Sequence, residues 1–501
     1  METLQYLITG FSVALTPMNL FYCFLGCLWG TMVGILPGIG PLGGIAILLP
    51  LTFKMDPASS IIMLSGIFYG AMYGGSTTSI LLNIPGEAAS IATCLDGYQM
   101  ARQGRAGPAL VVAALGSFTG GTISILALML FAPPLAKAML KIGPGEEFSL
   151  MVLALIIMSF VSSAPLLKTL AMILLGLLIA TVGMDPFTAY PRFTFGTLGL
   201  ANGIDFVPMA IGLFGVSEIL MNFEEMAKVG VIKPAFRDLF PRWKDLRDSL
   251  GPISRGSVIG LFFGFIPGIS HVVSTFISYA VEKKLSRHPE EFGKGRIEGV
   301  AGPETANNAT TGTAMVPLLV LGIPAIPATA LLMSALLIHN VNPGPQLIQD
   351  HPAVFWGLIA SMYIGNFVLV ILNLPLVGIF VNLLRIPYAY LVPSILVISI
   401  VGVYGVNSNP VDIILLGFFG IVGYVLRKFR FDMAPLVLAL VLGDKIEMSF
   451  RRALTTSEGS LWIFFKSSFS KIFLIAAALI LVLQLIAWLA GFRTREKEES
   501  P

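Results

Sequence analysis

The chain has 501 residues, of which 55% are hydrophobic and only 12% are charged. Soluble domains carry about 25% charged residues, so this composition excludes a water-soluble protein of this length. Glycine (52 residues) and proline (32 residues) are abundant, and the net charge is only +3. The high hydrophobicity excludes a disordered or collagen-like chain. The composition therefore predicts a polytopic membrane protein that is unusually rich in helix-breaking residues.

Long parts of the sequence carry no charge. Residues 3–53, 305–349 and 472–492 contain no Lys, Arg, Asp or Glu, whereas 22 of the 59 charged residues lie between Glu224 and Glu304. Long apolar runs without a two-residue alternation favour helices over a membrane β-barrel. Since a helix needs about 20 apolar residues to cross the bilayer, we expect an all-α polytopic membrane protein with about 10–14 membrane-embedded segments.

A self-match at an offset of 230 residues indicates two structurally repeated halves. The segment Gly30–Gly40 (GTMVGILPGIG) aligns with Gly260–Ser270 (GLFFGFIPGIS), and each copy is followed by a Ser/Thr-rich stretch and an Ile-Pro pair. We expect a first transport repeat over 1–225 and a charged cytoplasmic linker over 226–255. A second transport repeat would cover 256–450, and a C-terminal helix with a polar tail would cover 451–501.

Glycine and proline interrupt an apolar helix at matched places in the two halves. For the glycines alone, close helix packing is an equally good explanation. The shared Pro-Gly-Ile, however, predicts broken helices, which free backbone groups at membrane depth and mark a transporter's binding site. The predicted hinge or broken-helix residues are Gly34, Pro37, Pro85, Gly264, Pro267 and Pro324.

The second broken segment is expected to be re-entrant. Residues 228–255 hold seven Lys/Arg and residues 283–296 hold five, so the positive-inside rule places both on the cytoplasmic side. Only about 25 apolar residues separate them, too few for two crossings. A hairpin that turns at Pro267-Gly268 fits both facts; a single span that breaks the rule is the alternative.

Uncharged polar residues are the candidate ligands, since hydroxyls, amides and backbone groups can hold Na⁺ or a carboxylate without a buried charge. Hydrogen bonding between packed helices is the alternative. No Arg or Lys lies within the motifs, so helix ends and amides would have to hold an anion. Sodium is expected near Gly38, Thr78, Gly268 and Thr311. The predicted substrate-binding residues are Gly38, Gly40, Ser76, Thr77, Thr78, Asn83, Gly268, Ser270, Asn307, Asn308 and Thr311.

An enzyme is not expected. The chain has no Gly-x-x-x-x-Gly-Lys-Ser/Thr loop, and its four histidines have no zinc-site spacing. No cofactor is expected beyond a coupling ion, Na⁺ or H⁺. His271 is the ionisable group of the second broken motif, and a packed, hydrogen-bonded role is favoured for it over contact with a substrate.

The two Pro-Gly motifs, together with residues 73–78 (YGGSTT) and 83–86 (NIPG), resemble the large membrane subunit of tripartite tricarboxylate transporters, the TctA family. The resemblance covers about residues 15–450. It implies a bacterial inner-membrane carrier that works with a small TctB-like membrane subunit and a periplasmic TctC-like binding protein. It also implies uptake of carboxylates driven by a cation gradient. In the second copy, Ser270 and His271 replace Gly40 and Pro41, so the two halves need not contribute equally.

The leading hypothesis is a secondary active transporter subunit that imports tricarboxylates or related small carboxylates by Na⁺ or H⁺ symport. The motif-bearing helices would move against a scaffold of longer helices. An anion channel and a non-transporting membrane scaffold are the alternatives. The matched breaks favour an occluded site over a continuous pore, and a scaffold would not need them.

Overall fold

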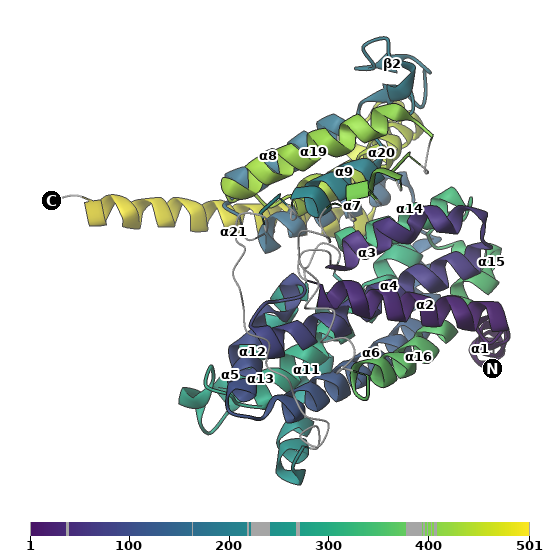
Figure 1. The fold of residues 1–501 in the computed structure, drawn as a ribbon. Coiled ribbons are helices and arrows are strands. Elements are labelled where there is room, and N and C mark those ends of the chain that lie inside the picture. Colours follow the sequence, from purple (N-terminus) through teal and green to yellow (C-terminus); the bar gives the residue numbers. More distant parts are fainter. Residues whose placement is uncertain are drawn as a thin grey trace.

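The computed structural model shows a protein built almost entirely of helices (Figure 1). It describes residues 2–36, 40–162, 164–217, 220–221, 241–266, 271–376 and 408–499, with several positions between 393 and 404. Within these ranges the only strands are β1 (Gly183–Met184) and β2 (Pro191–Arg192), which form an antiparallel hairpin. The prediction of an all-α polytopic membrane protein is confirmed.

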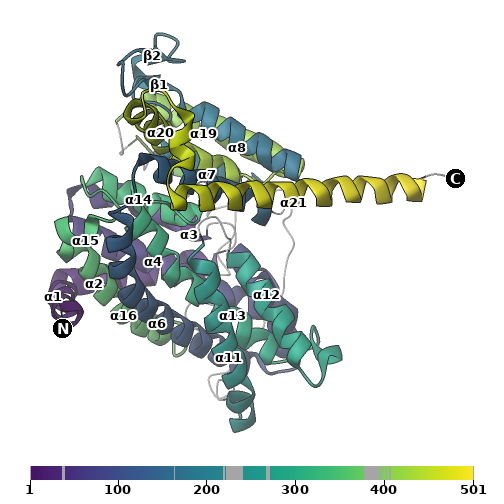
Figure 2. The ribbon, with the colours of Figure 1, turned by 180° about the vertical axis from the view of Figure 1, so that it is seen from behind.

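The helices lie in two groups (Figures 1 and 2). We call the lower group in Figure 1 the motif bundle and the other group the upper layer. The motif bundle contains α1 (Glu2–Ala14), α2 (Pro17–Ile35), α3 (Gly40–Leu48), η1 (Leu49–Lys54), α4 (Pro57–Leu82), η2 (Ala88–Ser90), α5 (Ile91–Arg102), α6 (Ala106–Met139), α11 (Trp243–Gly264), α12 (His271–Leu285), η6 (Pro289–Glu291), α13 (Glu298–Thr313), η7 (Pro317–Leu321), α14 (Pro327–Ile338), α15 (Leu347–Asp350) and α16 (Pro352–Asn373). The upper layer contains α7 (Pro144–Val161), α8 (Leu166–Ala180), η3 (Leu198–Leu200), α9 (Phe206–Ala210), η4 (Ile211–Val216), α19 (Pro410–Lys428), α20 (Ala434–Thr456), η8 (Leu461–Phe465) and α21 (Ser468–Glu499).

One helix ends before each Pro-Gly motif, and another begins after it. In the first half α2 ends at Ile35 and α3 begins at Gly40, which has a left-handed φ of 58°. In the second half α11 ends at Gly264 and α12 begins at His271. The prolines and following glycines themselves, at 37–38 and 267–268, lie outside the described residues. The structure therefore has an interrupted helix at both predicted places.

The glycines before each break bring two helices into backbone contact. A Cβ atom on Gly30 or Gly34 of α2 would collide with the carbonyl oxygen of Ile67 or Ala71 on α4. A Cβ atom on Gly260 of α11 would likewise collide with the carbonyl oxygen of Ala306 on α13. Gly264 likewise packs against Thr310 and Thr313. Each half thus packs its broken helix on its neighbour through the same glycine register.

A second break recurs with matching backbone geometry. Asn83 ends α4 with φ 60° and Gly322 ends η7 with φ 64°, both in the left-handed region. Four residues later Glu87 and Ile326 adopt nearly identical extended conformations, with φ of −148° and −147°. The backbone N–H of each of these two residues donates to a hydroxyl three residues further on, from Ser90 or Thr329. The repeat seen in the sequence is therefore also a repeat of local structure.

Each half also packs on the other. Helix α6 of the first half lies against α13, and α16 of the second half lies against α4.

The upper layer touches the motif bundle through α3, which contacts η4, and through α14, which contacts α9 and α20. In α20, Lys445 Nζ donates to the carbonyl oxygen of Gly322 at 2.6 Å. The second broken segment is thus tied to the upper layer.

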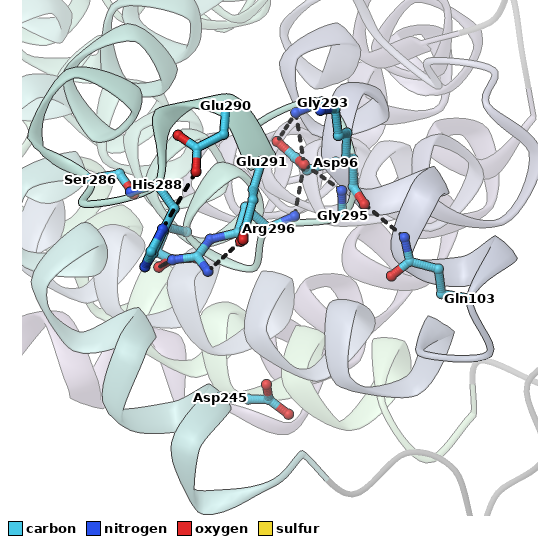
Figure 3. A network of polar contacts seen from close by, with 12 residues as sticks. Asp96, Gln103, Asp245, Ser286, His288, Glu290, Glu291, Gly293, Gly295 and Arg296 are labelled. Atoms are coloured by element: carbon cyan, nitrogen blue, oxygen red, sulfur yellow. Dashed lines mark hydrogen bonds and ion pairs between the residues drawn. The ribbon is translucent and has the colours of Figure 1, made fainter.

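Helix α5, the start of α11 and the loop after α12 lie at the end of the motif bundle that faces away from the upper layer (Figure 1), and charged residues of these elements lie near one another (Figure 3). Asp245 near the start of α11 pairs with Arg105 at 2.6 Å, before α6. Asp96 on α5 accepts backbone hydrogen bonds from the loop after α12. The start of α11 and the end of α12 therefore lie at the same end, as a re-entrant hairpin requires. Since α11 begins at Trp243, the last part of the predicted linker is helical.

Five of the described helices are long and apolar enough to cross a membrane: α2, α6, α16, α19 and the Ser468–Ile486 part of α21. Shorter apolar helices include α8, α14 and residues Phe206–Val216. Only 11% of the apolar window of α21 is buried, so that helix presents its side chains outward, as in contact with lipid. The number of embedded segments, 10–14, stays a prediction.

Candidate functional site

A cavity of about 540 Å³ lies between the motif bundle and the upper layer. This volume is within the range of small-molecule sites. Its wall contains residues from both repeats: Gly40 and Pro85 from the first half, and His271 and Pro324 from the second. The upper layer closes the other side with Met158, Phe214, Gly215, Arg427, Ala434, Val437 and Leu438. The two pairs of helix breaks therefore meet at one cavity.

Four helices open onto this cavity with their N-terminal ends. Its wall includes the first residues of α3 and α12 and those of α14 and of η2 with α5. The first N–H groups of a helix have no partner within the helix, and the helix dipole makes this end partially positive. Several such ends around one space form a site for an anion that needs no lysine or arginine.

Three ionisable side chains stand among the described lining residues: Glu87, His271 and Arg427. Arg427 comes from the last turn of α19, on the upper-layer side. His271, at the start of α12, is buried and packs edge-on against Phe68 with ring centroids 5.9 Å apart. Its Nε2 atom has no hydrogen-bond partner among the described residues, so the expected packing is present and the expected hydrogen bond on this nitrogen is not.

Behind Glu87, polar residues continue into the motif bundle. Asn307 Nδ2 on α13 donates to Glu87 Oε1 at 2.8 Å. One helical turn away, Glu304 is completely buried, with Oε2 2.5 Å from the hydroxyl of Ser76 on α4. The hydroxyl of Thr93 on α5 donates to the other oxygen, Oε1. Asn307 thus contacts Glu87 on the cavity wall and lies one helical turn from the buried Glu304 on the same helix.

The predicted ligands are distributed around this system. Gly40, Pro85 and Pro324 lie on the cavity wall, while Ser76 and Asn307 belong to the polar group behind it. The other described ligand candidates lie outside the cavity lining. Thr77 is buried, and Asn83 is an exposed residue at the end of α4. The remaining three donate hydrogen bonds within the motif bundle: Thr78 to Gly75 O, Thr311 to Asn307 O and Asn308 to Ser117 Oγ. Gly34 and Gly264 lie at helix contacts. The predicted residues Pro37, Gly38, Pro267, Gly268 and Ser270 lie outside the described residues.

Three charged residues of this region were not among the predicted ligands. Glu304 immediately precedes the charge-free run 305–349, Glu87 directly follows the Ile-Pro-Gly motif, and Arg427 ends an apolar helix. Ionisable residues at membrane depth are functional candidates by default, so this signal was present in the sequence. Arg427, which lies outside the apolar motifs, adds a cationic side chain to the cavity wall.

The fold and the site together define a multi-pass membrane protein of the transporter type, with broken helices from two related halves around one central cavity. Residues 20–438 match the family described as the tripartite tricarboxylate transporter TctA family. The chain belongs to this family, as the resemblance of its motifs implied. Since the family is one of tripartite transporters, its members work with further subunits.

Two relatives come from Agrobacterium vitis. The "uncharacterized 52.8 kDa protein in TAR-I ttuC' 3'region" is 50% identical over 464 residues, covering 93% of this chain and 92% of that protein. The "uncharacterized protein in TAR-II ttuC' 3'region" is 46% identical over 242 residues, covering 48% of this chain and 98% of that protein. No solved structure gives a significant match to the chain.

Proposed function

We propose that this chain is the carrier subunit that moves tricarboxylates or related small carboxylates across the bacterial inner membrane by symport with Na⁺ or H⁺. It would receive its substrate from a periplasmic binding protein and work beside a small membrane subunit. The observation that carries the proposal is the cavity onto which four helix N-termini open. Membership of the TctA family supports the substrate class and the partners.

The cavity has the chemistry that a polycarboxylate needs. Helix N-termini on the motif-bundle side supply N–H donors. Arg427 faces them from the upper layer, and a guanidinium can hold a carboxylate through two parallel hydrogen bonds. A substrate with two or three carboxylates would therefore bridge the two groups of helices. Apolar wall residues such as Met72, Met158 and Phe214 exclude water around it.

The arrangement also suggests how access alternates. A substrate between two separately packed groups of helices is released when one group moves against the other. The contacts of α3 and α14 with the upper layer would open and re-form in such a movement. The close glycine contacts within each half would keep the motif bundle rigid while it moves.

The test is uptake of radiolabelled citrate into proteoliposomes that contain the complete complex, with the binding protein outside. We expect saturable uptake and counterflow, and accumulation that responds to an imposed Na⁺ or pH gradient. Flux that does not saturate, without counterflow, would indicate a channel. Absence of any flux of citrate and of smaller dicarboxylates would contradict the transport function.

Arg427 offers a sharper test of the cavity. Arg427→Gln should raise the KM for citrate by about tenfold or more, because one charge-assisted contact is lost. Arg427→Lys should have a smaller effect, since the charge remains but the paired geometry does not. Arg430→Gln is the matched control, because Arg430 is exposed just beyond the same helix. An unchanged KM in Arg427→Gln would remove this residue from the substrate site.

A further inference from the structure

Two carboxylates stand together where the cavity meets the interior of the motif bundle. Glu87 is on the cavity wall, and Glu304 is completely buried behind it. Asn307 touches Glu87 and lies one helical turn from Glu304 on α13. The three side chains, which we call the acidic triad, belong to both halves of the chain.

One oxygen of the triad has no partner. Asn307 is 1% exposed, and its Oδ1 atom accepts no hydrogen bond within the described part of the chain. The amide nitrogen is the group that donates to Glu87, because a carboxylate oxygen only accepts. A buried amide oxygen without a partner is costly. An unpartnered amide oxygen and two carboxylates are the kinds of donor that suit a cation.

No described side chain supplies that positive charge. Neither Glu87 nor Glu304 forms an ion pair with a Lys, Arg or His in the ranges that the structure describes. The other titratable groups near Glu304 are Tyr73 and Cys94, which are neutral or negative. On the neighbouring helices, Arg255 is paired with Glu282 at 2.5 Å. The buried charge of Glu304 is therefore held by hydroxyl groups alone.

The second repeat shows that the fold does not need an acid at Glu87. Ile326 occupies the matching position with the same backbone conformation, and it too lies on the cavity wall. The turn therefore forms without a carboxylate there. Because Ile326 supports the same turn in the second half, the Glu87 carboxylate is available for another role.

We propose that the acidic triad binds Na⁺, with carboxylate oxygens of Glu87 and Glu304 and the Oδ1 atom of Asn307 as ligands. The inference rests on the proposed function, for which it names the coupling ion and its place. Oxygen ligands suit such a hard cation. This ligand set differs from the predicted one near Gly38, Thr78, Gly268 and Thr311.

The position of the triad explains why cation and substrate would move together. Glu87 stands on the wall of the cavity proposed to hold a polycarboxylate, so its negative charge repels the substrate. A bound Na⁺ removes that repulsion, and by linkage a bound substrate strengthens Na⁺ binding to the same degree. The empty carrier and the doubly loaded carrier are then the favoured states, which is the requirement of symport.

The first test compares Na⁺ stabilisation of the purified complex in detergent. Wild-type protein should melt at a higher temperature in NaCl than in equal choline chloride, because a ligand of the folded state stabilises it. Glu304→Gln should show no such difference. Glu298→Gln, on the same helix but ion-paired with Arg296 at the surface, should behave as wild type. No Na⁺ effect in the wild type, or an undiminished one in Glu304→Gln, would overturn the proposal.

The second test measures citrate transport in proteoliposomes at fixed pH. Replacing Na⁺ by choline should slow wild-type uptake by about tenfold or more, the size of effect expected from one lost charge interaction. Glu304→Gln and Glu87→Gln should transport at rates that no longer depend on Na⁺. Wild-type citrate counterflow in Na⁺ buffer separates the two hypotheses. If counterflow is absent, the proposed function fails; if it occurs without any Na⁺ dependence, or with dependence on protons alone, only the Na⁺ site fails.

Discussion

Asp96 and Glu304 are both completely buried carboxylates of the motif bundle, yet they are held in opposite ways. Asp96 accepts backbone N–H groups from Gly293, Gly295 and Arg296 at 2.7–3.0 Å, and the Tyr279 hydroxyl at 2.9 Å (Figure 3). Among the described residues, the hydrogen bonds to the Glu304 carboxylate come from hydroxyl groups, those of Ser76 and Thr93.

The two sets of partners differ in what they can do. A backbone N–H can only donate, whereas a hydroxyl can donate or accept after a rotation. Asp96 therefore acts as an acceptor for these N–H groups, and it fixes the loop after α12 to α5. The surroundings of Glu304 tolerate a change of charge state. We conclude that Asp96 stabilises the fold, whereas the surroundings of Glu304 suit a cation that binds and dissociates.

The largest expected effect is on folding, at Asp96. In Asp96→Asn one oxygen becomes an NH₂ group that points at backbone donors, and the anion is lost. Hydrogen bonds to buried charges contribute up to about 3 kcal/mol each, so we expect the folded state to lose about 3 kcal/mol or more. Thermal melting of the detergent-solubilised protein measures this. A variant as stable as the wild type would show that the loop is held by other contacts.

A smaller loss is expected at Glu87. Glu87→Ile gives the first repeat the residue that the second repeat has at Ile326, where the backbone is nearly the same. The bond from the backbone N–H of Ala89 to the Glu87 carboxylate is lost, and a helix cap of this kind contributes about 1 kcal/mol. The same melting assay applies, with Glu87→Gln as the isosteric control. A loss as large as in Asp96→Asn would make Glu87 structural.

Almost no loss is expected at Glu304 in buffer without Na⁺. In Glu304→Gln one of the Ser76 and Thr93 hydroxyls can turn to accept from the new NH₂ group while the other still donates to the remaining oxygen, and an uncompensated buried charge disappears. Removing such a charge is often neutral or stabilising, so we expect a change within about 0.5 kcal/mol of wild type, or a small gain. A loss comparable to that of Asp96→Asn would show that the comparison of the two carboxylates is wrong.

The sequence predicted the features that depend on local chemistry. Prolines and glycines act on their own segment, so the breaks after Gly34 and Gly264 and their repetition were visible as spacing. The glycine register and the left-handed turns at Asn83 and Gly322 follow from the same kind of local rule. Spacing alone left open whether Gly34 and Gly264 serve a helix break or close helix packing. In the structure both glycines lie at helix contacts.

The composition of the site was not predictable from spacing. Glu87, Asn307 and Arg427 are distant in sequence. Only the packing of α13 and α19 on the first half brings Arg427 to the same cavity as Glu87 and Asn307 into contact with Glu87. Polar residues near a motif can also face away from it, as exposed Asn83 does. Tertiary arrangement therefore decides which polar residues share a site. The scarcity of charge in the chain makes the few buried charges the most informative residues.

A pH-dependent effect is expected at a third carboxylate, Asp185, in the hairpin beside α20. The backbone N–H of Thr188, helped by that of Phe187 and by the Arg451 guanidinium, holds the pKa of Asp185 well below its usual range. A lowered pKa in the folded state stabilises the protein above the unfolded-state pKa of about 3.9, and this stabilisation is lost as the pH falls through the folded-state value. Asp185 thus resembles Asp96 in its partners.

Melting temperatures of the wild type and of Asp185→Asn, measured across pH, check this. The wild type should be the more stable by a constant margin between about pH 5 and pH 8, and the margin should shrink only below about pH 4. Glu290→Gln, at an exposed position of the loop after α12, should leave the profile unchanged. A margin that already narrows near neutral pH would mean that backbone N–H groups do not fix the charge state of Asp185. The distinction between carboxylates held by N–H groups and those held by hydroxyls would then lose its physical basis.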